Sequence, residues 1–106
     1  MNDTQFVEAS RHLAQRAMRE AGADFDRRLN YVTMRVLARD FTAPERTIAK
    51  RTYERFVGLY RADVGEARSL LNVGDSPFDE ALPLTESAAW TMLASQLMNL
   101  DEVLNK

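Results

Sequence analysis

Apolar residues recur with the period of an α-helix along most of the chain, and they are densest near its C-terminal end. Between Thr85 and about Leu104, one wide arc of the helical wheel collects Ala89, Trp90, Leu93, Ala94, Leu97, Leu100 and Leu104. The opposite side holds Thr91, Ser95, Asn99 and Glu102. Because such a wide arc needs neighbours on several sides, we expect this helix at the centre of the fold with one edge in solvent. We expect Trp90 to be a core anchor rather than a binding platform.

The first helix is expected from about Asp3 to Ala21, because Gly22 suits the left-handed residue that ends many helices. The face expected to be buried carries Phe6, Leu13, Ala14, Ala17 and Ala21. The face expected in solvent carries Arg11, His12, Gln15, Arg16 and Arg19. The sequence shows neither converging metal ligands nor an orienting partner for His12, so we interpret this single histidine as a surface residue.

The second helix, from Asp24 to about Arg39, has two apolar strips. Phe25, Leu29, Val32 and Val36 form one strip, and Tyr31, Met34 and Ala38 form another on nearly the opposite side. One core cannot cover both, so this helix is either sandwiched between neighbours or offers Tyr31, Met34 and Ala38 to a partner. Between the strips lie Arg28, Arg35 and Arg39, and we predict that one or more of these three pairs with Asp101 or Glu102. An anion or nucleic-acid contact is the alternative.

The third helix has a clear start, because Thr42 and Glu45 form a capping box and Pro44 lies in the first turn. It is expected to reach Ala62. Ile48, Thr52, Phe56 and Leu59 are expected to face inward with Ala49, Tyr53 and Tyr60 beside them, and Lys50, Arg51, Arg55 and Arg61 are expected to face outward. A short fourth helix, Val64 to Val73, follows the cap Asp63 and should bury Val64, Ala67, Leu70 and Leu71.

Composition favours a single all-α domain over residues 1–106, a compact bundle of four to five helices with one irregular loop, about 74–84, before the last helix. A chain of this length buries roughly two-thirds of its unfolded surface. Phe78, Leu82 and Leu84 suggest that the loop lies over the bundle. Without cysteine, disulfides, thiolate metal sites and c-type haem attachment are excluded. We expect neither a signal peptide nor a membrane span in this sequence.

The charges are unevenly distributed, although the net charge is only −2. Residues 1–63 carry 12 basic and 9 acidic side chains, and residues 64–106 carry 2 basic and 7 acidic ones. We expect the two parts to attract each other within the fold, and a basic binding face is the alternative.

Residue patterns that carry known chemistry are missing from the sequence, so we expect no enzyme, cofactor or metal site. The acidic residues Asp75, Asp79 and Glu80 do not have the spacing of a calcium loop. A helix-turn-helix over residues 46–71 is a weak match, because its second helix offers only Arg68 and Asn72 to bases. Nucleic-acid binding therefore stays an alternative, through Lys50, Arg51, Arg55 and Arg61.

Four sets of short phrases lie in order along the chain. One set is Asn2-Asp3, Phe6-Val7-Glu8-Ala9, Arg11, Leu13-Ala14 and Arg16; another is Val36-Leu37-Ala38-Arg39 with Thr42 and Glu45. The others are Leu70-Leu71-Asn72-Val73-Gly74 with Ser76-Pro77, and Ala88-Ala89-Trp90 with Asn99-Leu100-Asp101-Glu102. Together these phrases resemble a planctomycete domain of unknown function that is often called PSD-one. The phrases cover nearly all of this chain but only the C-terminal part of that domain. Ala38 and Asp40 stand where the family often has Gly and Pro.

The resemblance implies the tail of a large, exported or cell-envelope protein, whose other modules can include a cytochrome-c-like domain, and it implies no reaction. We therefore expect a non-enzymatic structural or interaction domain, the C-terminal fragment of a longer protein, that packs against other modules of its parent or against a protein partner. The alternatives are a small nucleic-acid-binding protein and an accessory domain that steadies a redox or hydrolytic module.

Overall fold

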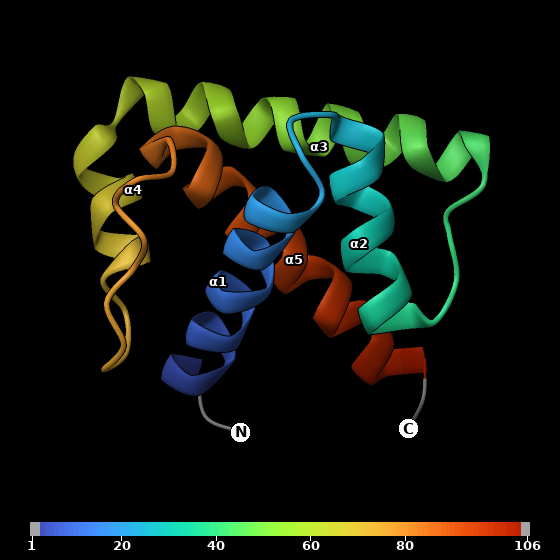
Figure 1. Cartoon of the computed structure of the whole chain (residues 1–106), viewed down its shortest axis with the longest axis horizontal. Coiled ribbons are helices and arrows are strands. Elements are labelled where there is room, and N and C mark those ends of the chain that lie inside the picture. Colours follow the sequence, from blue (N-terminus) through green and yellow to red (C-terminus); the bar gives the residue numbers. More distant parts are fainter. Residues whose placement is uncertain (1–2, 105–106) are drawn as a thin grey trace.

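Five α-helices form the described part of the chain, which covers the backbone of residues 3–104 and the side chains of residues 3–101 in this computed structural model. The helices are α1 (Asp3–Glu20), α2 (Phe25–Leu37), α3 (Ala43–Ala62), α4 (Val64–Leu71) and α5 (Leu84–Leu104) (Figure 1). The structure therefore confirms the expected all-α bundle of four to five helices.

The helix starts follow the capping residues in the sequence. The Asp24 side chain accepts a hydrogen bond from the Arg27 N–H at 3.0 Å, and Asp63 accepts one from the Glu66 N–H at 3.1 Å. Thr42 starts α3 with a complete capping box. These side chains bind backbone N–H groups that have no partner inside a helix, so local chemistry sets where α2, α3 and α4 begin.

Two helices end earlier than the sequence predicts. The second helix stops at Leu37 because Ala38 adopts a left-handed backbone, with φ 60°, while its N–H still bonds the Met34 carbonyl oxygen at 3.2 Å. The fourth helix stops at Leu71 rather than Val73, and the backbone beyond it turns toward α1.

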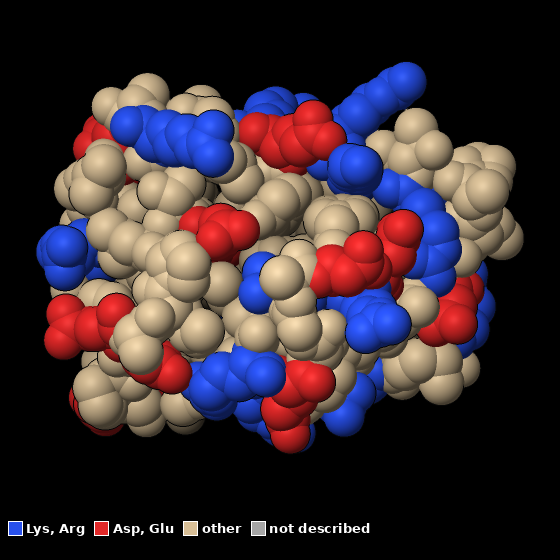
Figure 2. All heavy atoms as spheres, turned by 45° about the horizontal axis from the view of Figure 1, so that its top comes forward, with Lys and Arg blue, Asp and Glu red and all other residues tan. Residues whose placement is uncertain are grey.

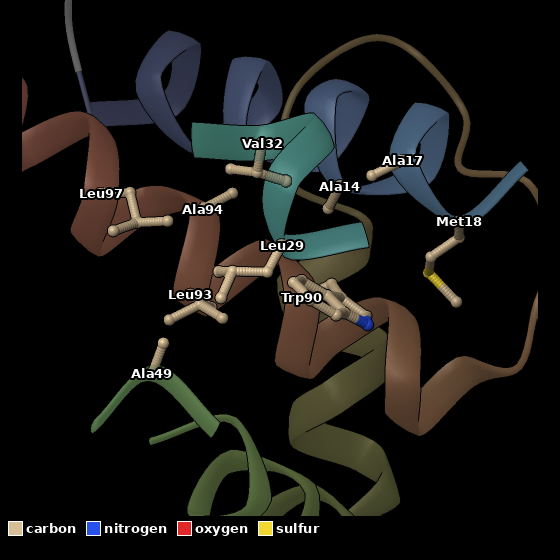
Figure 3. Packing of buried hydrophobic residues seen from close by; sticks show 10 residues of the cluster. All are labelled: Ala14, Ala17, Met18, Leu29, Val32, Ala49, Trp90, Leu93, Ala94 and Leu97. Carbon is tan, nitrogen blue, oxygen red and sulfur yellow. The ribbon is translucent and has the colours of Figure 1, made fainter. Parts of the chain in front are cut away.

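The last helix is central, as its wide apolar arc predicts. Each of the other four helices contacts α5, which runs behind α1 and α2 and below α3 in Figure 1. The main core cluster surrounds it; Figure 3 labels its members, which are Ala14, Ala17, Met18, Leu29, Val32, Ala49, Trp90, Leu93, Ala94 and Leu97. Thr91, which we expected at a solvated edge, is fully buried, and its hydroxyl donates to the Ser87 carbonyl oxygen at 2.7 Å.

Trp90 is 1% exposed and lies in an aromatic group at the centre of this cluster. Its ring centroid is 5.1 Å from that of Phe25 and 4.8 Å from that of Tyr53. Burial raises the pKa of the Tyr53 hydroxyl to about 12. These three rings come from α5, α2 and α3, so the aromatic group ties three helices together.

A second, smaller core cluster lies where α4 meets the start of α5. Its buried members are Ala67, Leu71 and Ala88, and Tyr60, Leu70, Phe78 and Leu84 pack against them. Phe78 belongs to the loop between α4 and α5, so its packing agrees with the expectation that this loop lies over the bundle. Val64, which we expected inside, is exposed because only the later turns of α4 meet α5.

Arg11 and Gln15 are buried, contrary to the solvent-facing position expected for them. Arg11 donates to the carbonyl oxygens of Leu71 at 2.7 Å, Val73 at 2.8 Å and Ser76 at 2.7 Å. Its buried Nε has no hydrogen-bond partner among the described residues. The guanidinium therefore donates to backbone carbonyl oxygens at the end of α4 and at the start of the loop. Helical periodicity could not indicate this role.

Other side chains of α1 hold the same loop. The Glu8 carboxylate accepts the Ser76 N–H at 2.6 Å, which lowers the pKa of Glu8. Gln15 accepts the Asp79 N–H at 3.0 Å, and Arg19 pairs with the Asp79 carboxylate at 3.2 Å. We call the four residues Glu8, Arg11, Gln15 and Arg19 the loop clamp. They lie along one stripe of α1 at helical spacing.

Candidate interaction surface

One flank of α3 exposes large apolar side chains that we expected to face the core. Ile48 is 64% exposed and Leu59 is 57% exposed. The core receives the neighbouring row of α3, which consists of Phe56, as expected, and of Ala49, Tyr53 and Tyr60, which we expected beside the inward residues. We call the row of Ile48, Thr52, Arg55 and Leu59 the α3 seam; Thr52 is half-buried and the other three are exposed. The 4-3-4 spacing of the seam is that of residues that pack against another helix.

A groove of about 300 Å³ opens beside the first half of the α3 seam, between α3 and α5. It is lined by Phe41, Glu45, Ile48, Ala49, Thr52, Leu93, Gln96, Leu97 and Leu100. Leu93 and Leu97 belong to the buried core, whereas Leu100 is 41% exposed. The groove therefore has an apolar floor and exposed aliphatic side chains from both α3 and α5.

Four basic side chains of α3 carry no ion pair to any described residue. Arg55 belongs to the α3 seam and Arg51 lies beside it, whereas Lys50 and Arg61 lie on the opposite side of the helix by their positions on the helical wheel. Lys50, Arg51, Arg55 and Arg61 are all exposed. The Arg55 guanidinium lies 5.7 Å from the centroid of the Phe56 ring. Figure 2, which brings the α3 side of the molecule forward, shows acidic side chains interspersed with basic ones. The surface thus has local positive charge rather than one continuous positive field.

At the start of α3 the charges are already paired. Arg39 binds the Glu45 carboxylate through two hydrogen bonds of 2.8 and 2.9 Å, and this lowers the Glu45 pKa to about 2. Arg46 bonds the side chains of Asp26, at 3.3 Å, and Asn30. Arg39 and Arg46 therefore hold α2 and its following link against α3, so the free basic groups lie farther along α3.

A second groove, of about 430 Å³, lies between α1, α2 and α5. It is lined by Phe6, Ala9, Leu13, Arg35, Val36, Met98 and Asp101. The apolar members are mostly half-buried, and the two charged members come from α2 and α5. Groove volumes of 300 to 1,000 Å³ are typical of sites that hold small ligands or parts of a partner.

The three arginines of the α2 region have separate roles. Arg28 donates to the Gly22 carbonyl oxygen at 2.6 Å and so covers the end of α1. Arg39 pairs with Glu45, so both Arg28 and Arg39 have partners that are near in the sequence. The Arg35 guanidinium lies 3.3 Å from the Tyr31 ring centroid, and Arg35 shares the second groove with Asp101. Its predicted ion pair stays a prediction, and the Glu102 side chain lies outside the described residues.

The strip predicted as a partner face on α2 is discontinuous. Met34 is 49% exposed and Ala38 is exposed, whereas Tyr31 is half-buried, packs against the main core cluster and bonds the Glu20 carboxylate. The α3 seam and its groove therefore offer a larger apolar surface than Tyr31, Met34 and Ala38 do.

In the described part of the chain, no three His, Asp or Glu side chains gather in a way that could hold a metal ion. His12 is exposed. The described helices include none with the length and apolar character that crossing a membrane requires.

Comparison with protein-family models, with curated proteins and with solved structures found no match. The resemblance to the PSD-one domain therefore rests on the sequence phrases alone, and the surface of the fold carries the functional argument.

Proposed function

We propose that the chain is a non-enzymatic helical domain that packs against another module of its parent polypeptide or against a protein partner. The observation that carries this proposal is the groove between α3 and α5, where the aliphatic side chains of Ile48 and Leu100 are exposed beside an apolar floor. Burial of aliphatic side chains in such a groove is favourable by about 25 cal/mol per Å² of apolar surface. The resemblance to a tail domain of large exported proteins supports a neighbouring module as the partner.

The groove has the composition of an interface centre. Its exposed aliphatic side chains are surrounded by polar ones, including Gln96 and Thr52, and the ionic group Glu45 is already bound to Arg39. A partner could therefore cover the groove without leaving an unpaired charge inside it.

A site-specific photo-crosslinker placed at Leu100 in the native full-length polypeptide tests the proposal. We expect crosslinks that mass spectrometry maps to one defined module or partner segment, and we expect Ile48→Gln to reduce them. A crosslinker at Thr47, which is exposed outside the groove, is the matched control. Equal crosslinking from Thr47 and Leu100, or none from Leu100, would contradict the proposal.

A nucleic-acid-binding function is the second candidate, because Lys50, Arg51, Arg55 and Arg61 are exposed without ion pairs to described residues. Such binding weakens steeply with salt, by a factor that grows with the number of phosphates contacted. Retention of duplex DNA at low salt that is lost on Arg51→Gln and Arg55→Gln would support it. No retention at low salt would remove it.

A further inference from the structure

We propose that the segment that docks on the α3 seam is an amphipathic helix with acidic residues along one flank. This inference rests on the interaction function proposed above and names the chemistry of the partner. It is carried by two features that lie side by side on α3: exposed apolar groups at helix-packing spacing, and basic groups without ion pairs to described residues.

The spacing of the seam favours a helix as the occupant. Ile48 and Leu59 are three helical turns apart on the same flank of α3, about 16 Å along the helix axis. Between them, Thr52 and Arg55 complete the 4-3-4 pattern into which side chains of a facing helix insert. A partner helix of about three turns would cover both aliphatic side chains and reach over the groove toward Leu100.

The charges indicate the polar flank of that helix. Arg51 and Arg55 project on the side of the seam that faces away from the groove, by their positions on the helical wheel. Neither has an ion pair to a described residue. A Glu or Asp row on the partner would meet both guanidinium groups, so electrostatic complementarity fixes its register and excludes a basic helix.

The same charges disfavour a second copy of this chain. In an antiparallel pair of α3 helices, the flank that carries Arg51 and Arg55 meets its own counterpart. In a parallel pair, Arg55 faces Arg55. Like charges at such positions are destabilising. A nucleic acid would pair with the arginines but would leave Ile48 and Leu59 uncovered at both ends of the seam.

Three synthetic helical peptides test the partner chemistry against the full chain. The first has Leu at 4-3-4 spacing and a Glu flank, the second replaces Glu by Gln, and the third keeps Glu but replaces Leu by Ser. The start of α1 and the end of α5 lie on the side of the molecule opposite α3 (Figure 1). The protein can therefore be attached through its N-terminus while the α3 seam stays accessible to the peptides. Fluorescence anisotropy at low and physiological salt gives the affinities.

We expect the Glu peptide to bind about two- to thirty-fold more tightly than the Gln peptide, because two exposed charge pairs contribute about 0.2–1 kcal/mol each. The Ser peptide should not bind. Ile48→Gln with Leu59→Gln should abolish binding, and Arg51→Glu with Arg55→Glu should reverse the preference toward a Lys-flanked peptide. The control Arg16→Glu, an exposed arginine on α1, should change nothing. Circular dichroism confirms that each variant is folded.

Equal binding of the Glu and Gln peptides would overturn the acidic flank while the interaction function stands. Failure of all three peptides together with specific crosslinking from Leu100 would also overturn this inference alone. Failure of both would remove the inference and the proposed function. Displacement of the Glu peptide by duplex DNA would show that a nucleic acid, and not a helix, occupies the seam. Concentration-dependent self-association that depends on Ile48 would show that a second copy of the chain occupies it.

Discussion

Ala38 has a strained backbone conformation that a glycine at the same position would adopt without strain. Its φ of 60° is left-handed, and it is the one residue other than glycine with positive φ in the described chain. A left-handed conformation costs an L-residue about 1–2 kcal/mol, which glycine avoids. We therefore predict that Ala38→Gly raises the free energy of unfolding. Relief of the strain contributes about 1 kcal/mol, and the conformational entropy that glycine adds to the unfolded chain reduces this gain. Urea unfolding followed by Trp90 fluorescence measures it.

Gly22 provides the reverse experiment at a similar backbone position. Its φ is +79°, and a Cβ added there would meet nothing within 4 Å. Gly22→Ala should therefore destabilise the fold through backbone strain alone, by about 1 kcal/mol. If Ala38→Gly destabilised the protein as Gly22→Ala does, the left-handed ending of α2 would be wrong.

Arg11 is the residue whose replacement should cost most among the charged residues of α1. Arg11→Met would leave three carbonyl oxygens without their donor, that of buried Leu71 and those of half-buried Val73 and Ser76. We predict a loss of about 3–5 kcal/mol, as for a broken buried charge network. Thermal unfolding measures it, with exposed Arg16→Met as the control expected to stay within about 0.5 kcal/mol. Equal losses for both variants would show that the loop clamp is not needed.

The sequence could not place Arg11 in the interior, because helical periodicity assigns an arginine beside His12 and Gln15 to a polar face. That face is polar, but part of it meets a loop whose backbone groups need partners. A usable signal was the row Glu8, Arg11, Gln15 and Arg19 at helical spacing, together with an irregular loop elsewhere. Nothing in the sequence says that the two meet.

At the scale of elements, the start of α3 was predictable, whereas its inward face was predictable only in part. The capping box of Thr42 and Glu45 acts locally, so it can be read from a few residues. The orientation of α3 is tertiary. The seam of Ile48, Thr52, Arg55 and Leu59 and the buried row one position later have the same 4-3-4 spacing, so periodicity fits both. The candidate interaction surface was missed for this reason.

The same capping box makes the fold sensitive to acid. Hydrogen bonds from Arg39 lower the Glu45 pKa from 4.5 to about 2, and the Ser76 N–H lowers the Glu8 pKa. A carboxylate with a lowered folded-state pKa stabilises the fold fully above about pH 4.5. That contribution is lost as pH falls toward 2, because the unfolded chain then binds more protons.

We predict a fall in melting temperature between pH 5 and pH 2.5, and a shallower fall for Glu45→Gln, which cannot take up this proton. The variant should already be less stable at pH 7, since Arg39 loses its charged partner. Circular dichroism melts at five pH values give both curves. Parallel curves for the two proteins would remove Glu45 from the acid response.

At the scale of the whole molecule, the opposite charges of the two parts of the chain contribute little direct pairing. Among the described residues, the ion pair of Arg19 with Asp79 joins the basic part to the acidic part. Five further ion pairs lie within one part or the other, namely Arg11 with Glu8, Arg16 with Glu20, Arg39 with Glu45, Arg46 with Asp26 and Arg68 with Glu80. The central position of α5 holds the parts together, and the width of its apolar arc made this position predictable, because a central helix needs apolar residues on most sides.

Because α5 runs through both core clusters, the molecule should unfold as one unit. Ala88 belongs to the smaller cluster and Trp90 to the main one, two residues apart on the same helix. Leu71→Ala, in the smaller cluster, should cost about 2–5 kcal/mol through lost burial and the cavity left behind. We predict that Trp90 fluorescence and far-ultraviolet circular dichroism then report the same lowered midpoint. Leu59→Ala, at an exposed leucine, is the control and should shift neither. A circular dichroism transition that precedes the fluorescence transition would show instead that α4 and the clamped loop open separately, while the aromatic group around Trp90 stays packed.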